Sequence, residues 1–473
     1  MKTVNFVLSI CLLLLIVFLF ITDYYLSSNM PNDLTGNDYA RAEQFLPWNT
    51  YNMVSGDEVA PRFLKDGRFW YRSHTESGHE FVLVNPETRN REVAFDHDRL
   101  AAGLSALTDT TYEGHKLPFR EFNFLEGENS IQFFISDSIR WTCNISSYEC
   151  LSPDTVHKRQ IWERPSPDGQ WLVFERDENL WIRNIANGKE KQLSLDGEND
   201  YGYGVVPEGC CQEITNRRRG RKLSPRLKWS PDSRRIVAHR YDERNVKRLH
   251  LLEAADGRPI LHSYAYAMPG DSIIPKAEAW IFDIQSGVSR RVGVEPQPGG
   301  FTSNDTVYSV VQWTSDSKRL FYTTRSRDYK TYRLYNVNAR TGQATQVIEE
   351  VGSTYVELNQ FTRYHPAWRV MGNGSELIWW SERDGWGHLY LYDGSGNLKN
   401  RITSGAWLVT DVIHVDEDER KVYFTAVGKE EVGNPYYQYL YKINLDGSGL
   451  QLLSLENAAH TIKPFPSGEL FID

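Results

Sequence analysis

Serine residues flanked by glycine are the first candidates for chemistry, because many hydrolases expose a nucleophile in a Gly-x-Ser-x-Gly turn between a strand and a helix. The 473-residue chain contains no such motif. Ser395 and Ser448 come nearest, each standing between two glycines. Both follow Asp-Gly, a dipeptide that favours a hairpin turn, and neither precedes a helical pattern. We therefore interpret both as turn residues and assign no catalytic residue to this chain.

Motifs that hold metals or cofactors are equally absent from the sequence. There is no His-Glu-x-x-His pair, no phosphate-binding loop and no dinucleotide fingerprint after a strand. The 12 histidines are scattered, and we interpret His365, His388 and His460 as structural or surface residues rather than members of a catalytic triad. We expect a protein without a metal or a cofactor.

Two of the five cysteines, Cys143 and Cys150, are separated by six residues that look like the tip of a hairpin. Neighbouring antiparallel strands bring Cα atoms into disulfide range, roughly 4.4–6.8 Å. We expect a disulfide after export to an oxidising compartment; two unpaired cysteines in a hairpin are the alternative. Cys210 and Cys211 are adjacent, and no Cys-x-x-Cys or matching histidine spacing indicates zinc.

A repeated turn and strand must position these residues. A short polar turn followed by a hydrophobic strand recurs eight times, most clearly at Asp168, Asp232 and Asp316. Weaker copies centre on residues 66, 129, 373, 418 and 467. Repeats of about 40–50 residues with several short strands per unit are typical of β-propellers. The sequence therefore predicts an all-β, eight-bladed β-propeller with three or four antiparallel strands per blade; seven blades are the alternative.

A second kind of turn supports this interpretation. Segments in which aromatic or β-branched residues alternate with polar ones end in turn dipeptides such as Asn187-Gly188 and Asp446-Gly447. The alternation is typical of half-buried strands, and these dipeptides supply the positive φ that hairpin turns need. Helical periodicity is scarce, and the best candidates are residues 38–45 and 97–107. We expect very little helix after residue 110.

Residues 1–29 contain an apolar run from Phe6 to Ile21. Sixteen residues are short for a membrane-spanning helix and long for the core of a signal peptide. A cleaved signal peptide and an uncleaved apolar helix that anchors the chain in the membrane through residues 6–21 both remain open. In either case the body of the protein is expected to be exported, as a membrane-anchored, periplasmic or extracellular protein. Residues 30–58 are predicted to form a linker with a short helix, and residues 59–473 the propeller.

The charge pattern argues against nucleic acid as a partner. Net charge is −9 at pH 7, and no basic face with interleaved aromatic residues is evident. One basic run, residues 217–222, is either a solvated loop or a binding site for an acidic partner. Aromatic residues make up 13% of the chain, which favours β structure.

Several segments resemble the propeller of the dipeptidyl peptidase IV family. Residues 381–390, Ser-Glu-Arg-Asp-Gly-Trp-Gly-His-Leu-Tyr, are very similar to a stretch of that propeller. Other similar stretches are residues 229–233, 243–252, 264–271, 279–283 and 434–442. The resemblance runs from about residue 38 to residue 473. It implies an eight-bladed propeller that, in the family, precedes an α/β-hydrolase domain carrying the Ser, Asp and His of a serine peptidase.

The end of the chain resembles the last propeller strand of this family. We therefore expect the catalytic hydrolase domain to be absent, so that no residue of the family's triad is carried over. The resemblance implies a serine-type dipeptidyl peptidase, but this chain alone is predicted to be inactive.

The resemblance also implies where a substrate amino group would bind. Family members that remove dipeptides usually carry adjacent glutamates on a short propeller helix, and the corresponding residues 201–213 offer Glu208 and Glu213. An ammonium group held by two carboxylates needs both within salt-bridge reach. These two are five residues apart, so they bind substrate only if a loop brings them together; otherwise they are ordinary exposed carboxylates.

The sequence leaves two hypotheses for function. In the first, the chain is the propeller half of an exported dipeptidyl peptidase IV-like serine peptidase, and it gates and docks peptide substrates for a hydrolase domain. In the second, it is a stand-alone, membrane-anchored propeller that binds peptides or proteins without catalysis. A large exposed apolar patch where a hydrolase would dock favours the first hypothesis. The oligomeric state is not indicated by the sequence.

Overall fold

The computed structural model describes two compact units, Met1–His157 and Lys158–Asp473. The predicted apolar helix at residues 6–21 lies outside the described residues. Within the part of the chain that is described, no helix is long and apolar enough to cross a membrane. The described residues are 34–50, 53–56, 59–136, 139–151, 154–155, 160, 162–206, 220, 222–254, 257–299, 310–358, 367–431, 433–468 and 470–473.

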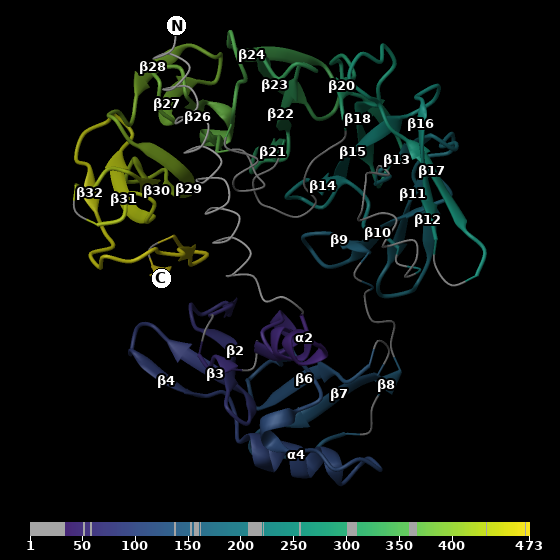
Figure 1. Ribbon diagram of the computed structural model, residues 1–473, viewed down its shortest axis with the longest axis vertical. Coiled ribbons are helices and arrows are strands. Elements are labelled where there is room, and N and C mark those ends of the chain that lie inside the picture. Colours follow the sequence, from purple (N-terminus) through teal and green to yellow (C-terminus); the bar gives the residue numbers. More distant parts are fainter. Residues whose placement is uncertain are drawn as a thin grey trace, which may run out of the picture. The chain divides into compact units, whose positions relative to one another are not determined.

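The N-terminal unit contains two four-stranded sheets (Figure 1). The first consists of β1 (Arg62–Phe63), β2 (Phe69–Thr75), β3 (Gly78–Asn85) and β4 (Asn90–Val93). The second consists of β5 (Phe122–Phe124), β6 (Ser130–Phe134), β7 (Ile139–Asn144) and β8 (Asp154–Thr155). One buried cluster joins the two sheets, with Trp70 and Phe81 from the first and Phe122 and Phe133 from the second.

The described residues of this unit form three short α-helices: α2 (Gly36–Glu43), α3 (Pro47–Thr50) and α4 (His97–Ser105). Helix α4 begins at His97 because the Asp96 side chain accepts hydrogen bonds from the backbone N–H groups of Asp98 and Arg99. Helices α2 and α4 confirm the two predicted helices. Among the described residues after 110, the only helices are the 3₁₀ turns η2 (Gly114–Lys116) and η3 (Gly372–Gly374), as expected.

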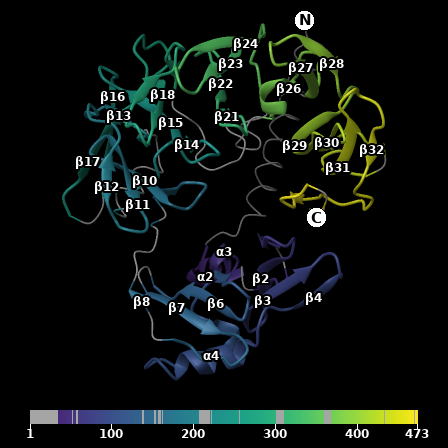
Figure 2. The same cartoon turned by 180° about the vertical axis from the view of Figure 1, so that it is seen from behind.

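The C-terminal unit contains five larger sheets that follow one another along the chain (Figures 1 and 2). The first consists of β9 (Arg164–Pro165), β10 (Trp171–Arg176), β11 (Asn179–Asn184) and β12 (Glu190–Gln192). The second consists of β13 (Tyr201–Tyr203), β14 (Leu227–Trp229), β15 (Arg235–Asp242), β18 (Lys276–Asp283), β19 (Ser289–Arg291) and β20 (Gln297–Pro298). The third consists of β21 (Val311–Trp313), β22 (Arg319–Arg325), β23 (Thr331–Asn338) and β24 (Ala344–Val351).

Two further sheets and two hairpins complete this unit. The fourth sheet consists of β25 (Arg369–Met371), β26 (Glu376–Ser381), β27 (His388–Asp393) and β28 (Leu398–Arg401). The fifth consists of β29 (Leu408–Asp416), β30 (Lys421–Val427), β31 (Tyr439–Asn444) and β32 (Gln451–Leu452). The hairpins are β16 (Arg248–Glu253) with β17 (Ile260–Ala265), and β33 (Lys463–Pro464) with β34 (Phe471–Ile472). Strands pair antiparallel throughout these sheets.

The fold is therefore all-β, with seven blade-like sheets, two in the first unit and five in the second. The prediction of eight blades is wrong, and the alternative of seven is confirmed. The eighth turn, at Ser467 and Gly468, lies in the two-stranded hairpin β33–β34, whose strands have two residues each. A turn motif predicts only the pair of strands that it joins, whereas a full blade also needs outer strands. Among the described residues, no outer strand pairs with β33 or β34.

Neighbouring sheets of the C-terminal unit bury their faces against each other. Strand β26 shows how: Leu377 and Trp379 belong to a cluster shared with the third sheet, whereas Ile378 and Trp380 belong to one shared with the fifth. Successive side chains of a strand point to opposite faces, so each inner strand serves two interfaces. The same alternation in β15 places Ile236 toward the first sheet of the unit and Val237 toward the third.

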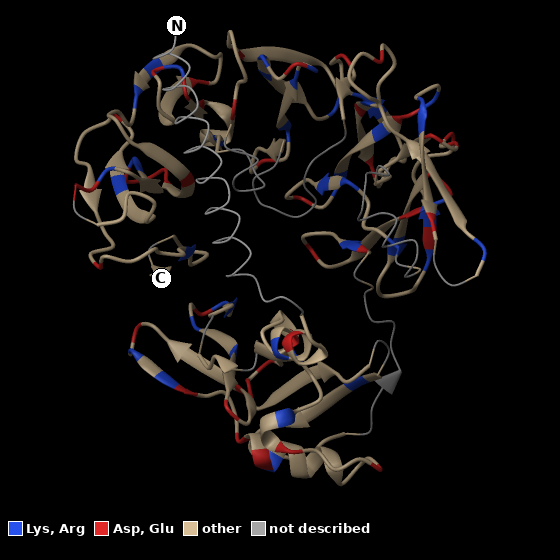
Figure 3. Ribbon diagram, viewed as in Figure 1, with Lys and Arg blue, Asp and Glu red and all other residues tan. Residues whose placement is uncertain are grey.

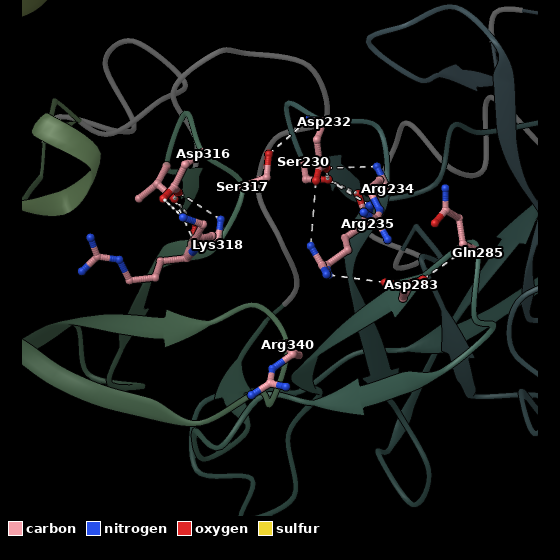
Figure 4. A network of polar contacts seen from close by, with 12 residues as sticks. Ser230, Asp232, Arg234, Arg235, Asp283, Gln285, Asp316, Ser317, Lys318 and Arg340 are labelled. Carbon is pink, nitrogen blue, oxygen red and sulfur yellow. Dashed lines mark hydrogen bonds and ion pairs between the residues drawn. The ribbon is translucent and has the colours of Figure 1, made fainter.

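Hydrogen bonds also link the polar turns of consecutive sheets (Figure 4). The backbone N–H of Asp168 donates to Oγ of Ser233, and the N–H of Asp232 donates to Oγ of Ser317. Within each turn the aspartate carboxylate accepts hydrogen bonds from a preceding hydroxyl and from the N–H two residues later. The turn that identified the repeat in the sequence is thus also a contact between blades.

Candidate functional site

A polar cavity of about 260 Å³ lies beside the β10–β11 turn and strand β13 in the C-terminal unit. Four carboxylates line it: Glu175, Glu178, Asp200 and Glu243. Among the described residues that line it, Arg248 is the single cation. Along the described sheets, positively and negatively charged residues are otherwise interspersed (Figure 3).

The tight turn between β10 and β11 brings Glu178 to the cavity. Asp177 and Glu178 both have positive φ, 51° and 63°, which suits the two-residue hairpin turn that matches the twist of the flanking strands. The backbone N–H of Glu178 donates to Oε1 of Glu175 at 2.8 Å, and its carbonyl accepts from the N–H of Tyr203 at 2.8 Å. These bonds hold the turn against β13.

Gly202 makes room for the Glu178 carboxylate. A Cβ at this position would lie 2.2 Å from Oε2 of Glu178 and 2.5 Å from Cγ1 of Val205. Both distances are far below van der Waals contact, so a side chain at this position would require Glu178 and Val205 to shift.

Asp200 and Glu243 complete the group from the other side. The N–H of Glu243 donates to the backbone carbonyl of Asp200 at 2.7 Å, which ties the residue after β15 to the residue before β13. Nη1 of Arg248 lies 3.4 Å from Oδ2 of Asp200. Arg248 therefore neutralises Asp200 directly.

Burial and mutual repulsion perturb the carboxyl groups of the cavity. Burial, and then the negative charges of Glu175, Asp200 and Asp177, raise the pKa of Glu178 to about 7. Burial, and then Asp200, also raise the pKa of Glu243 to about 7, although Arg248 lowers it. Burial raises the pKa of Glu175 as well. The cavity thus carries carboxylates that a positively charged ligand would stabilise in their ionised form.

Carboxylates dominate the charged residues of the described lining. None of the described lining residues is a Ser, Thr, Cys, His or Lys that could serve as a nucleophile. No group of three or more His, Cys, Asp or Glu side chains is arranged to hold a metal ion anywhere in the described part of the chain. The carboxylates of the lining match a positively charged group.

The residues predicted as turn or structural residues behave as such. Ser395 donates its N–H to Asp393, and Ser448 donates its hydroxyl to Asp446, each inside its own turn. His388 is buried and bonded to Thr403 and to the carbonyl of Gly405. His460 contacts Asp473, while His365 lies outside the described residues.

Glu208 and Glu213, the predicted substrate-binding pair, lie in residues 207–219, outside the described residues. The four carboxylates that do line the cavity were not predicted, because they are spread from residue 175 to residue 243. Glu178 lies in a tight turn and Glu243 follows a strand, positions where carboxylates are common for structural reasons. Gly202, placed within an aromatic strand, was the one local signal of a close approach.

Cys143 and Cys150 in the N-terminal unit are joined in a disulfide. The loop between them rests on helix α4. Oη of Tyr148 accepts a hydrogen bond from the N–H of Asp96 at 2.7 Å, and the Arg99 guanidinium lies 4.2 Å from the Tyr148 ring centroid. Gly103 passes so close that a Cβ there would lie 2.3 Å from the Tyr148 carbonyl oxygen. The disulfide therefore closes a loop that packs against the helix.

Comparison with known proteins gives a consistent result. The model of the dipeptidyl peptidase IV (DPP IV) N-terminal region matches residues 133–473. The probable dipeptidyl-aminopeptidase B of Talaromyces marneffei is 28% identical over 324 residues, which cover 64% of this chain and 34% of that protein. The probable dipeptidyl-aminopeptidase B of Aspergillus fumigatus is 26% identical over 321 residues, which cover 64% of this chain and 33% of that protein. This chain therefore matches about a third of the length of these relatives.

A solved structure shares the fold. Porphyromonas gingivalis dipeptidyl peptidase 4 superposes with a TM-score of 0.60 at 19% sequence identity, over 90% of this chain and 56% of that one. At this identity the likeness concerns the fold alone.

Proposed function

This chain belongs to the family of dipeptidyl peptidase IV N-terminal regions, and on that premise we propose that it is the propeller half of an exported dipeptidyl peptidase IV-like serine peptidase. Its role in this proposal is to gate and dock peptide substrates for a hydrolase domain that carries the catalytic triad. In this proposal the nucleophile of that domain attacks the docked peptide, and the side chains of this chain only position the peptide.

The acidic cavity is the observation that supports a docking role. Four carboxylates and one arginine stand among its described lining residues, none of which is a Ser, Thr, Cys, His or Lys. The α-amino group of a peptide has a pKa of roughly 7.7–8.0 and is largely an ammonium ion at neutral pH. An ammonium group with three donors is the peptide feature that matches several converging carboxylates.

Docking of an ammonium group would be coupled to proton release. Glu178 and Glu243 have pKa values of about 7, so each is only partly ionised near neutrality. An approaching positive charge favours the ionised form and lowers both values. Each bound peptide would then displace protons from these carboxyl groups, and binding would strengthen as the pH rises from 6 to 7.5.

Calorimetric titration of the chain with a peptide pair tests the proposal. The ligands are Gly-Pro-Ala-amide and its N-acetylated form, which differ in the terminal positive charge. We expect the free peptide to bind at least tenfold more tightly, since hydrogen bonds to charged groups contribute roughly 1.5–3 kcal/mol. Glu178→Gln should remove most of that difference. Glu126→Gln, at an exposed turn in the other unit, is the matched control and should leave it unchanged.

Equal binding of the two peptides, or full discrimination by the Glu178→Gln variant, would overturn the docking role. Heats measured in buffers of different ionisation enthalpy supply a second readout. If no protons are released on binding, the carboxyl groups of the cavity are not the ligands of the ammonium group.

Export is part of the same proposal and rests on the apolar run at residues 6–21. Fractionation of cells that produce the chain from its own start codon tests it. Recovery in the cytosol, with the N-terminal residues intact, would contradict export.

A further inference from the structure

A second, basic cavity of about 180 Å³ lies at the other end of strand β15. Arg235 begins this strand and lines the basic cavity, whereas Glu243 follows the strand and lines the acidic one. Eight residues of strand separate the two sites by roughly 26 Å at 3.3 Å per residue. The basic cavity is therefore a separate site.

Two sheets build this cavity. Arg235, Asp283 and Arg290 come from the sheet of β15, β18 and β19, and Arg340 comes from the turn between β23 and β24. The two parts are in contact: a Cβ at Gly342, in the same turn, would lie 3.6 Å from Cβ of Arg290. The backbone N–H of Gly293 also donates to the Gly342 carbonyl at 2.8 Å.

The charge of Arg235 is already neutralised. Its guanidinium lies 3.6 Å from Oδ2 of Asp283 and 3.9 Å from Oδ2 of Asp232. Asp283 also accepts hydrogen bonds from the N–H groups of Gln285 and Ser286 and from the Ser286 hydroxyl. Burial raises the pKa of Asp283, but the bonds from Ser286 and the charge of Arg235 outweigh it and hold the pKa below its usual value. Asp283, the single carboxylate among the described lining residues, is therefore ionised and engaged by Arg235 and by the Ser286 turn.

Arg290 and Arg340 carry the remaining charge. Neither guanidinium has a hydrogen bond or ion pair to any residue that the structure describes. Figure 4 shows Arg340 apart from the linked group of Asp232, Arg235 and Asp283, with no dashed contact. Two arginines whose guanidinium groups have no described partner thus line one small cavity.

We propose that this cavity is a binding site for a tetrahedral oxyanion, a phosphate or sulfate group, held between the guanidinium groups of Arg290 and Arg340. Each guanidinium presents a planar fork of donors that matches two oxygens of such an ion. At about 180 Å³ the cavity is smaller than the roughly 300–1,000 Å³ typical of drug-sized ligands, so it suits a single ionic group. The oxyanion is either free in solution or the headgroup of an anionic lipid.

Calorimetric titration of the full chain with sodium phosphate, at constant ionic strength set with sodium chloride, tests the site. We expect saturable binding that weakens at least tenfold in the double variant Arg290→Ala/Arg340→Ala. Both side chains are exposed, so the variant should fold, which circular dichroism and the unfolding temperature verify. Arg258→Ala removes an exposed arginine from the β16–β17 turn of the same unit and should bind phosphate like the parent.

Vesicles distinguish the two sources of the oxyanion. Phosphatidylcholine vesicles with and without phosphatidic acid are sedimented with the parent chain and the double variant. Retention that needs both phosphatidic acid and the two arginines assigns the site to a lipid headgroup; phosphate binding without such retention assigns it to a free ion. If the double variant equals the parent in both assays, or if phosphate has no effect beyond that of chloride, the site does not exist. Glu178→Gln should leave every result unchanged, so the outcome for this site is independent of the outcome for the proposed function.

Discussion

The backbone N–H of Asp232 donates a hydrogen bond to Oγ of Ser317, at 3.0 Å, across the boundary between two consecutive sheets (Figure 4). Ser317 has a φ of 59° and is 1% exposed. Its hydroxyl is thus held inside the boundary by a strained backbone. Ser233 repeats the arrangement one sheet earlier with Asp168. The hydroxyl of the serine that ends the turn motif therefore accepts a hydrogen bond from the neighbouring turn.

Replacing this serine should weaken the boundary between the sheets. We expect Ser317→Ala to lower the free energy of unfolding by about 1 kcal/mol, because the Asp232 N–H loses its partner. Urea denaturation followed by tryptophan fluorescence measures the change. Ser272→Ala, at an exposed position, is the control. Equal midpoints for the two variants would show that the bond contributes nothing.

The acidic cavity should make stability depend on pH. Glu178 has a pKa of about 7 in the folded chain, against roughly 4.3 in an unfolded one. Between these values the folded state holds more protons, so its stability falls as the pH rises from about 4.5 to 7 and then levels off. We expect Glu178→Gln to remove about 1 kcal/mol of this loss, a figure reduced for solvent screening because the group is only partly buried. Denaturation midpoints at pH 5 and pH 8 test it; a variant that gains nothing at pH 8 contradicts the prediction.

Gly202 should not tolerate a side chain. We expect Gly202→Ala to cost about 1–3 kcal/mol, because the new methyl group would overlap Oε2 of Glu178. Shortening the acid in Gly202→Ala/Glu178→Ala should recover part of that loss, and the double-mutant cycle isolates the contact. Gly293→Ala is the control, since a Cβ there meets its nearest neighbour at 3.5 Å, an ordinary distance. Additive effects of the two changes would contradict a direct overlap.

The Cys143–Cys150 disulfide should stabilise the fold without being essential to it. It closes a short loop, so the entropic gain is modest, about 2 kcal/mol. We expect Cys143→Ser/Cys150→Ser to fold with an unfolding free energy lower by that amount. Intact mass after thiol alkylation, with and without prior reduction, reports the bond in protein recovered from an oxidising compartment. Alkylation of both thiols without reduction would contradict its formation.

Residues 30–473 alone should not hydrolyse dipeptidyl or prolyl chromogenic substrates. The 473-residue sequence has no nucleophile elbow, and without a serine activated by histidine there is no acyl-enzyme route. Turnover that persists through repurification and is blocked by a serine-directed phosphonate would contradict this.

The β class, the hairpin turns and the short helices could be predicted because local signals specify them. Asp96 and the leucines of α4, or the Asp-Gly and Asn-Gly turns, act within a few residues. The number of blades could not be predicted, because a turn such as Ser467-Gly468 specifies only the two strands that it joins. It does not specify the outer strands that complete a sheet.

The acidic cavity could not be predicted for a related reason. Glu178 reaches Gly202 through the packing of a hairpin against an edge strand, and Glu243 reaches Asp200 through the pairing of β13 with β15. Neither proximity leaves a spacing pattern in the sequence. The same holds for Arg290 and Arg340, which two different sheets bring to one opening.

The shared clusters of the C-terminal unit bear on how the chain could be divided. The cluster around Trp379 takes Phe321 and Leu334 from the third sheet and Tyr390 from the fourth, yet no strand passes between these sheets. A cut between Leu358 and Ala367 would leave every described ladder of the third and fourth sheets intact and expose one half of an apolar face on each fragment. Two such fragments, expressed separately, should recognise each other and reassemble, whereas a cut inside a hairpin would destroy both partners. The boundaries between blades are therefore suitable positions at which to divide the chain for fragment complementation.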